Sequence, residues 1–153
     1  LTIRQLGLPL TAVEEQFRIL FHNHIEERQI TLGKAAERME MSPRNLQRIL
    51  AGDQKMTTQL LVELGNAFAI DKSRAVVAIE RFQSWQAYYD PTLITAVDLL
   101  RPVVERINAR GGVAEPLHPK AIEQLANWIA DVIIDHQEQI ARRREEIGTL
   151  QKG

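Results

Sequence analysis

The sequence predicts an all-α protein, and three observations support this fold class. Apolar residues recur at steps of three and four along most of the chain, as they do on one face of a helix, and runs with strict alternation are hard to find. Glycine is scarce, with 8 in 153 residues. Several of the periodic segments follow directly after Ser, Thr or Asp, the residues that cap helix N-termini. We therefore expect helices joined by short turns.

Five helices are expected in the first part of the chain, each with a start signal of its own. Thr11 is the expected N-cap of the first helix, with Glu14 three residues later as its capping-box partner. Ser42 before Pro43 is a strong start for the third, and Gly52 is suited to end it. The expected helices cover residues 11–27, 32–39 after Thr31, 43–51, a segment from Thr57 or Thr58 to Phe68, and 72–88 after Asp71.

Two longer helices are expected in the second part, after the breaker Asp90-Pro91. The first covers about 92–109, and Pro102 within it predicts a kink or a break. Gly111-Gly112 ends it, a loop leads to Pro119, and the last helix covers about 119–147. Residues 151–153 are expected to fray. The sequence thus predicts a domain at 1–89 and a helical dimerisation or regulatory region at 90–153.

The last helix carries a near-heptad apolar seam, the pattern of a coiled coil. His136 and Arg143 fall on it, so the coiled coil is imperfect. We expect a homodimer that pairs through this seam, and packing of the seam within one chain is the alternative. The expected seam residues are Ile122, Ile129, Ile133, His136 and Ile140.

Residues 31–52 meet the steric requirements of two short helices that pack across a tight turn. Ala36 supplies the small residue needed where the helices cross, and Thr31 and Ser42 cap them. The positions expected to be buried are apolar: Ala35, Met39, Met41, Leu46, Ile49 and Leu50.

This segment resembles the lambda-repressor-like family, the Cro and phage-repressor type of helix-turn-helix protein. The resemblance covers about residues 25–87 and is strongest over 31–68. Two positions depart from the family pattern: Glu40 stands where glycine is usual, and Ala35 where a large apolar residue is usual. Glu40 must then adopt a left-handed conformation, at a cost of about 1 kcal/mol or more. The resemblance implies a five-helix DNA-binding domain.

In such proteins the second helix of the motif, here Pro43–Ala51, lies in the DNA major groove. Arginine pairs with guanine there, and Asn or Gln with adenine. Residues 30–74 contain seven basic and five acidic residues, against a net charge of −1 for the whole chain. The expected base-reading residues are Ser42, Arg44, Asn45, Gln47 and Arg48, and the expected phosphate contacts are Thr31, Lys34 and Lys55.

Other classes of function find little support in the sequence. The absence of cysteine excludes disulfides, thiolate metal sites and cysteine nucleophiles. We find none of the common catalytic or phosphate-binding motifs, so we expect no enzyme and no cofactor. His22 and His24 are two residues apart on a helix and point apart, so we expect no metal site. No apolar run approaches the roughly 20 residues of a membrane span.

The sequence therefore predicts a sequence-specific DNA-binding transcriptional regulator, a dimeric repressor in the cytoplasm and associated with the nucleoid, with double-stranded DNA as its partner. Two alternatives stay open. The same fold also serves as a protein-binding adaptor or antitoxin-like module. A ligand-gated regulator would hold a small-molecule effector between the C-terminal helices.

Overall fold

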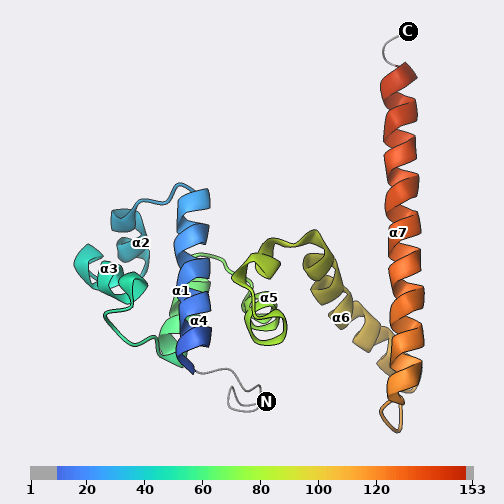
Figure 1. Ribbon diagram of the computed structural model, residues 1–153, viewed down its shortest axis with the longest axis horizontal. Coiled ribbons are helices and arrows are strands. Elements are labelled where there is room, and N and C mark those ends of the chain that lie inside the picture. The colour runs from blue at the N-terminus through green and yellow to red at the C-terminus, as the bar shows by residue number, and fades with distance from the viewer. Residues whose placement is uncertain (1–9, 151–153) are drawn as a thin grey trace. The chain divides into compact units, whose positions relative to one another are not determined.

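A computed structural model, which describes residues 10–150, shows that this part of the chain consists of helices and turns without a strand (Figure 1). The all-α prediction is confirmed. Residues 151–153, where fraying is expected, lie outside the described residues.

The helices follow one another with short connections, except before the last. The α-helices are α1 (Leu10–Glu27), α2 (Leu32–Arg38), α3 (Pro43–Ala51), α4 (Thr58–Ala67), α5 (Lys72–Val76), α6 (Pro91–Ala109) and α7 (Pro119–Leu150). A π-helix, η2 (Val77–Arg81), and a 3-10 helix, η3 (Trp85–Tyr89), lie between α5 and α6.

Local capping fixes where four of these helices begin. Each cap side chain accepts a hydrogen bond from the backbone N–H three residues later: at 3.4 Å for Thr31, 3.2 Å for Ser42, 3.2 Å for Thr57 and 3.0 Å for Asp71. These caps are confirmed, and Thr57 rather than Thr58 precedes α4. The prediction for Thr11 is wrong, because α1 begins at Leu10 and Thr11 lies within its first turn.

The prediction of one regular helix over 72–88 is also wrong. After α5 the helix widens into the π-turn of η2, and at Gln83 the backbone turns left-handed, with a φ of 54°. Ser84 N–H donates to the Ala78 carbonyl at 3.2 Å, and Trp85 N–H donates to Gln16 Oε1 of α1 at 3.0 Å. The second bond comes from α1, 69 residues earlier, so periodicity within the segment could not reveal it.

Pro102 does not interrupt α6, which runs from Pro91 to Ala109. The expected break is therefore not found. Proline removes the N–H that would bond to the Asp98 carbonyl. Every residue from Asp98 to Arg110 is exposed, so water can bond to that carbonyl and the helix continues.

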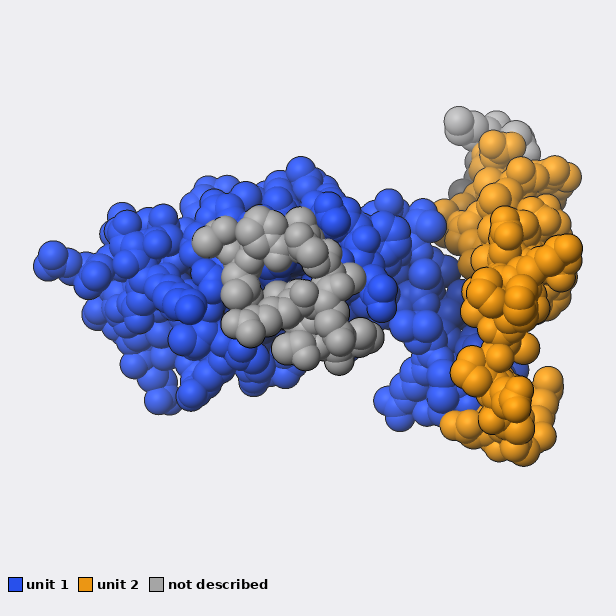
Figure 2. Space-filling model, turned by 60° about the horizontal axis from the view of Figure 1, so that its bottom comes forward, with its two compact units in different colours: residues 1–106 blue, residues 107–153 orange. Residues whose placement is uncertain are grey.

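The chain forms two compact units, residues 1–106 and 107–153 (Figure 2). The core lies in the first, where α1, α2, α3, α4 and η2 each bury apolar side chains. Leu93 at the start of α6 belongs to this core and Val97 packs against it. The first compact unit thus extends past residue 89 into α6, and the domain boundary at 89/90 stays a prediction. The fully buried large side chains are Leu20, Leu46, Ile49, Leu64, Phe68 and Ile79.

A buried imidazole connects three parts of this core. His24 of α1 is 4 % exposed. Its Nε2 lies 3.0 Å from the Phe68 carbonyl after α4, and its Nδ1 lies 3.3 Å from the Tyr89 hydroxyl of η3. Because a carbonyl only accepts hydrogen bonds, Nε2 carries the hydrogen, and in the neutral ring Nδ1 accepts from Tyr89. The imidazole thus joins α1, the end of α4 and η3 in its neutral form.

The surroundings of His24 disfavour its charged form. Burial lowers the pKa of His24 below its ordinary value of 6.5, and the charges of Arg28 and Arg74 lower it further. The hydrogen bond to Phe68 and the charge of Glu27 oppose this shift without reversing it. Burial also raises the pKa of Tyr89, so that its hydroxyl stays protonated.

The first prediction concerns the stability of the folded protein at low pH. A histidine whose pKa is lower in the folded state binds fewer protons there than in the unfolded chain, so stability falls as the pH drops below about 6.5. The free energy of unfolding, measured with urea, is expected to be smaller at pH 5.5 than at pH 7.5. His24→Asn is expected to reduce this difference. His22→Asn, at an exposed site on the same helix, is expected to leave it intact, and equal behaviour of the two variants would contradict the assignment.

Candidate nucleic-acid interface

Both ends of α3 are fixed by the residues that flank it. Ser42 has extended backbone angles and accepts from Asn45 N–H, and Pro43 occupies the first helical position. At the other end Gly52 adopts the left-handed conformation, with a φ of 87°. Its N–H and that of Asp53 donate to the carbonyls of Ile49 and Arg48 at 3.1 Å and 2.9 Å. The helix thus has a defined length and direction.

The turn between α2 and α3 contains a left-handed residue other than glycine. Glu40 has a φ of 52°, as its position in the sequence predicts. Its N–H donates to the Glu37 carbonyl at 3.0 Å, and Met41 N–H donates to the Ala36 carbonyl at 3.0 Å. These bonds terminate α2, and they offset the strain of about 1 kcal/mol that a side chain incurs in this conformation.

α3 has one buried face and one exposed face. Leu46 and Ile49 are buried in the core. Arg44 and Arg48, one turn apart, are exposed, and neither is paired with a carboxylate within the described part of the chain. The buried face therefore anchors a helix whose other side presents two free guanidinium groups.

Four of the five predicted base-reading residues surround one depression at the N-terminal end of α3. Ser42, Arg44, Asn45 and Arg48 line it together with Met41. Asn45 is half-buried, and its Nδ2 lies 3.9 Å from Met41 Sδ, at the limit of a weak hydrogen bond. The depression is polar, concave and open to solvent, with the two arginines on its wall.

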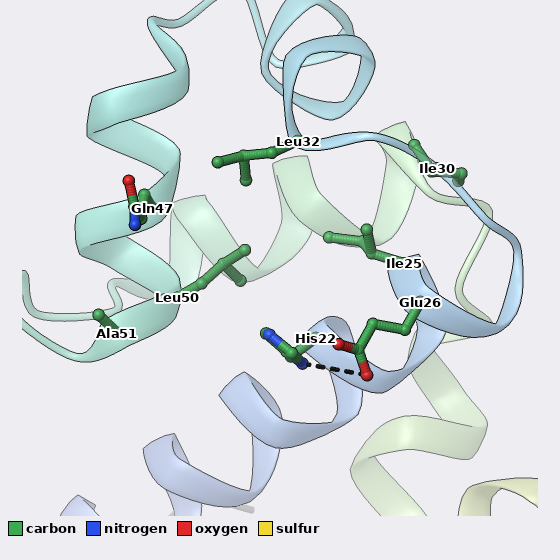
Figure 3. A pocket seen from close by; sticks show the side chains of 8 residues that line it. All are labelled: His22, Ile25, Glu26, Ile30, Leu32, Gln47, Leu50 and Ala51. Atoms are coloured by element: carbon green, nitrogen blue, oxygen red, sulfur yellow. Dashed lines mark ion pairs between the residues drawn. The ribbon is translucent and has the colours of Figure 1, made fainter.

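The fifth, Gln47, lies on a different surface. It lines a separate groove of about 470 Å³ (Figure 3). Helical geometry explains the division, because Gln47 and Arg48 are adjacent in sequence and point about 100° apart around the axis. The sequence placed all five residues in one group, whereas the structure puts Gln47 beside neighbours that belong to other helices.

The groove lies between the C-terminal part of α1, the start of α2 and the end of α3. In Figure 3 the side chains of Ile25, Leu32 and Leu50 point toward the same space from three directions. An ion pair borders it on α1, with His22 Nδ1 at 3.6 Å from Glu26 Oε2. No local pattern in the sequence indicates this groove, because its residues come from three segments that meet only in the folded chain. The remaining lining residues are Ile30 and Ala51.

The predicted phosphate contacts lie on exposed parts of the same unit. The Thr31 hydroxyl caps α2, with Lys34 N–H as its donor. Lys34 and Lys55 are exposed, and no carboxylate of the described residues pairs with either. Both ammonium groups are therefore free to meet an anion.

The predicted seam residues lie on α7 with their side chains uncovered or half-covered. Ile122 and Ile129 are 54 % and 39 % exposed, His136 is exposed, and Ile133 and Ile140 are half-buried. The second compact unit thus presents an apolar line to solvent.

The described residues offer neither a group of side chains for a metal ion nor a helix for a membrane span. No three His, Asp or Glu side chains come close enough together there to hold a metal ion. None of the helices in that part of the chain has the length and apolarity needed to cross a membrane.

We found no match to this chain among models of protein families, curated proteins or solved structures. A functional assignment therefore depends on the residues and geometry described above.

The second prediction concerns the end of α3. A Cβ at position 52 would be strained by the left-handed backbone and would lie 3.0 Å from Arg18 Nη1. Gly52→Ala is expected to lower the free energy of unfolding by about 1–2 kcal/mol. Gly52→Asn also adds a side chain at this position, but asparagine tolerates a positive φ. This variant is therefore expected to lower the free energy of unfolding by less than Gly52→Ala does. Urea unfolding measures both, and equal losses would assign the cost to the contact with Arg18.

Proposed function

We propose that the protein is a sequence-specific DNA-binding transcriptional regulator of the lambda-repressor-like, helix-turn-helix type, in which α2, the turn and α3 form the motif. One observation carries the proposal: Arg44 and Arg48, which pair with no carboxylate among residues 10–150, line one polar depression at the N-terminal end of a helix whose other face is buried. The N-terminal part of the second helix is the part that meets base edges in such proteins. Ala36 is fully buried, and its small side chain is what a close crossing of α2 and α3 requires.

The chemistry of the depression suits the major groove. A guanidinium group donates two parallel hydrogen bonds to guanine O6 and N7, which gives arginine its base preference. Two arginines one turn apart on α3 can address neighbouring base pairs. Ser42 and Asn45 lie next to them, while Gln47 reaches DNA only at the other edge of the helix.

Phosphate contacts would set the position of α3 on the duplex. Lys34 on α2 and Lys55 after α3 carry ammonium groups that pair with no carboxylate of the described residues, and Thr31 stands at the start of α2, where backbone N–H groups favour an anion. Contacts of this kind fix the register of a protein on DNA without selecting a sequence.

We further propose that the protein acts as a homodimer through α7 and represses by occlusion of a promoter in the cytoplasm. Two copies engage two half-sites of a palindrome, and the second contact becomes intramolecular. This raises the overall affinity by up to about 10²–10⁴ without any new contact.

A protein-binding module is the second candidate, and the groove of Figure 3 favours it. Its apolar walls, Ile25, Leu32 and Leu50, are suited to an apolar side chain of another protein. Selection from random double-stranded DNA separates the two functions. Enrichment of a defined sequence supports the regulator, and a lack of enrichment at low salt would favour the module.

The third prediction concerns base choice. On the best selected site, Arg44→Ala and Arg48→Ala are each expected to cost about 1–3 kcal/mol and to relax the preference at one position. Arg101→Ala is the matched control, because Arg101 is an exposed arginine of α6 that pairs with Glu105 at 2.8 Å. This variant is expected to change neither the affinity for the selected site nor the base preference. Fluorescence anisotropy on site and random duplexes measures the effects. Equal losses on both duplexes would make the two arginines phosphate contacts.

The fourth prediction concerns phosphate contacts. Lys34→Ala and Lys55→Ala are each expected to weaken binding to all sequences alike and to reduce the slope of log K against log salt by about 1. The measurement is affinity at several salt concentrations on two unrelated duplexes. A changed preferred sequence in either variant would show that the lysine contacts a base.

A further inference from the structure

α7 carries apolar side chains that nothing in the second compact unit covers. Ile147 is 56 % exposed, much like Ile122, and no side chain described between Ile107 and Gly148 is buried. A helix of 32 residues is about 48 Å long. In water, most of the stability of such a helix comes from the packing of its apolar face. The face of α7 therefore needs a partner.

The spacing of this face is that of a coiled coil, with two polar interruptions. Steps of three and four residues connect Ala126, Ile129, Ile133, His136, Ile140, Arg143 and Ile147. A second helix with the same repeat fits such a face, since each seam residue enters a space between four residues of the other helix. Polar residues within a seam lower stability, but they specify register and partner direction.

We infer that α7 binds α7 of a second copy, that the two helices run antiparallel, and that Arg143 lies opposite Ala126 of that copy. The inference rests on the proposed homodimer and specifies how its two halves meet. A two-fold axis across the helices produces such an arrangement, because the same face then serves both copies.

The positive charges of α7 oppose the parallel arrangement. Parallel helices in register would place Arg143 against Arg143 within the seam. Arg142, about 100° away around the axis, pairs with Glu138 of its own helix. Like charges in direct contact destabilise an interface. In the antiparallel register the two Arg143 residues lie 17 residues apart along the axis, about 26 Å. This distance exceeds the Debye length of about 8 Å at physiological salt, so their repulsion is screened.

The same register gives most of the apolar residues an apolar partner. Ile140 meets Ile129 of the second copy and Ile147 meets Ile122, while Ile133 meets His136, one of the two polar residues of the seam. Ala126 is small, so it leaves room for the aliphatic stem of Arg143, which can cover it while the guanidinium reaches solvent. Glu123, one turn before Ala126, offers a carboxylate near that guanidinium.

The apolar area fits a specific dimer. Three residues of the face are exposed, two are half-buried, and two further exposed residues flank it: Ile122, Ile129 and Ile147, then Ile133 and Ile140, then Leu125 and Val132. At roughly 80 Å² each, two copies would bury about 1,100 Å² of apolar surface, and specific interfaces bury about 1,200–2,000 Å² in total. The polar flanks of the helices supply the remainder.

The antiparallel arrangement also separates the points where the chains enter α7. The two Pro119 residues would lie 31 residues apart along the axis, or about 46 Å. Half-sites on DNA are about 34 Å apart. Parallel helices would bring both entry points to the same end.

The lack of native cysteine allows a direct test on the full chain. Ala126→Cys, Arg143→Cys and the double variant are oxidised mildly without DNA and separated on a non-reducing gel. The double variant is expected to form at least ten times more disulfide-linked dimer than either single variant. Ile129→Cys with Ile140→Cys provides a second pair, should the loss of Arg143 disturb the seam.

Three results would overturn the inference. Efficient cross-linking of Ala126→Cys alone would show parallel helices. A dimeric protein without cross-linking in either double variant would place the interface elsewhere. A wild-type chain that sediments as a monomer at about 50 µM would show that no second copy binds with the low-micromolar affinity that a dimer needs. Base preference is measured separately, so each of these results leaves the assignment of Arg44 and Arg48 to be judged on its own.

Discussion

The hydrogen bonds of one neutral imidazole connect the parts of the first compact unit. His24 belongs to α1, and it bonds the backbone at the end of α4 and a hydroxyl in η3. Tyr88, next to that hydroxyl, accepts the Asp71 N–H at 3.1 Å, while the Arg74 guanidinium lies 4.1 Å from its ring centre. The segment after α5 is thus attached by buried apolar side chains, such as Ile79, and by polar groups. Such groups define one arrangement, because a buried donor or acceptor without a partner costs about 1–3 kcal/mol.

The position of α3 depends on the same α1. Leu20 and Phe21 of α1 and Leu46 and Ile49 of α3 belong to one apolar core. This packing determines which side of α3 remains in solvent, and Arg44 and Arg48 occupy that side. The common direction of the two arginines is therefore set by buried side chains that do not contact a ligand. The proposed DNA contacts depend on the buried residues of α3 as much as on its exposed residues.

The sequence predicts those features that depend on a few neighbouring residues. The caps at Thr31, Ser42, Thr57 and Asp71 and the left-handed Glu40 are of this kind, since each depends on a side chain and on a backbone group within a few positions. Features that depend on distant partners are not predictable in this way. The break after η2 is held by Gln16, and the groove beside Gln47 combines three helices. A kink or a break is expected at Pro102, and the break does not occur for a related reason, because the exposure of α6 decides whether a lost hydrogen bond can be replaced by water.

The π-turn of η2 has a consequence for how this chain tolerates insertions and deletions. A π-turn contains one residue more than the α-helical turn it replaces. Loss of one residue between Val77 and Arg81 would convert this turn into regular α-helix, and the residues that follow would keep nearly the same direction around the helix axis. Tyr88 and Tyr89 would then still face His24, whereas loss of a second residue has no wider turn to absorb it and would rotate them by about 100°. This stretch can therefore lose one residue but not two, and related sequences that keep these aromatic contacts should differ there by at most one residue.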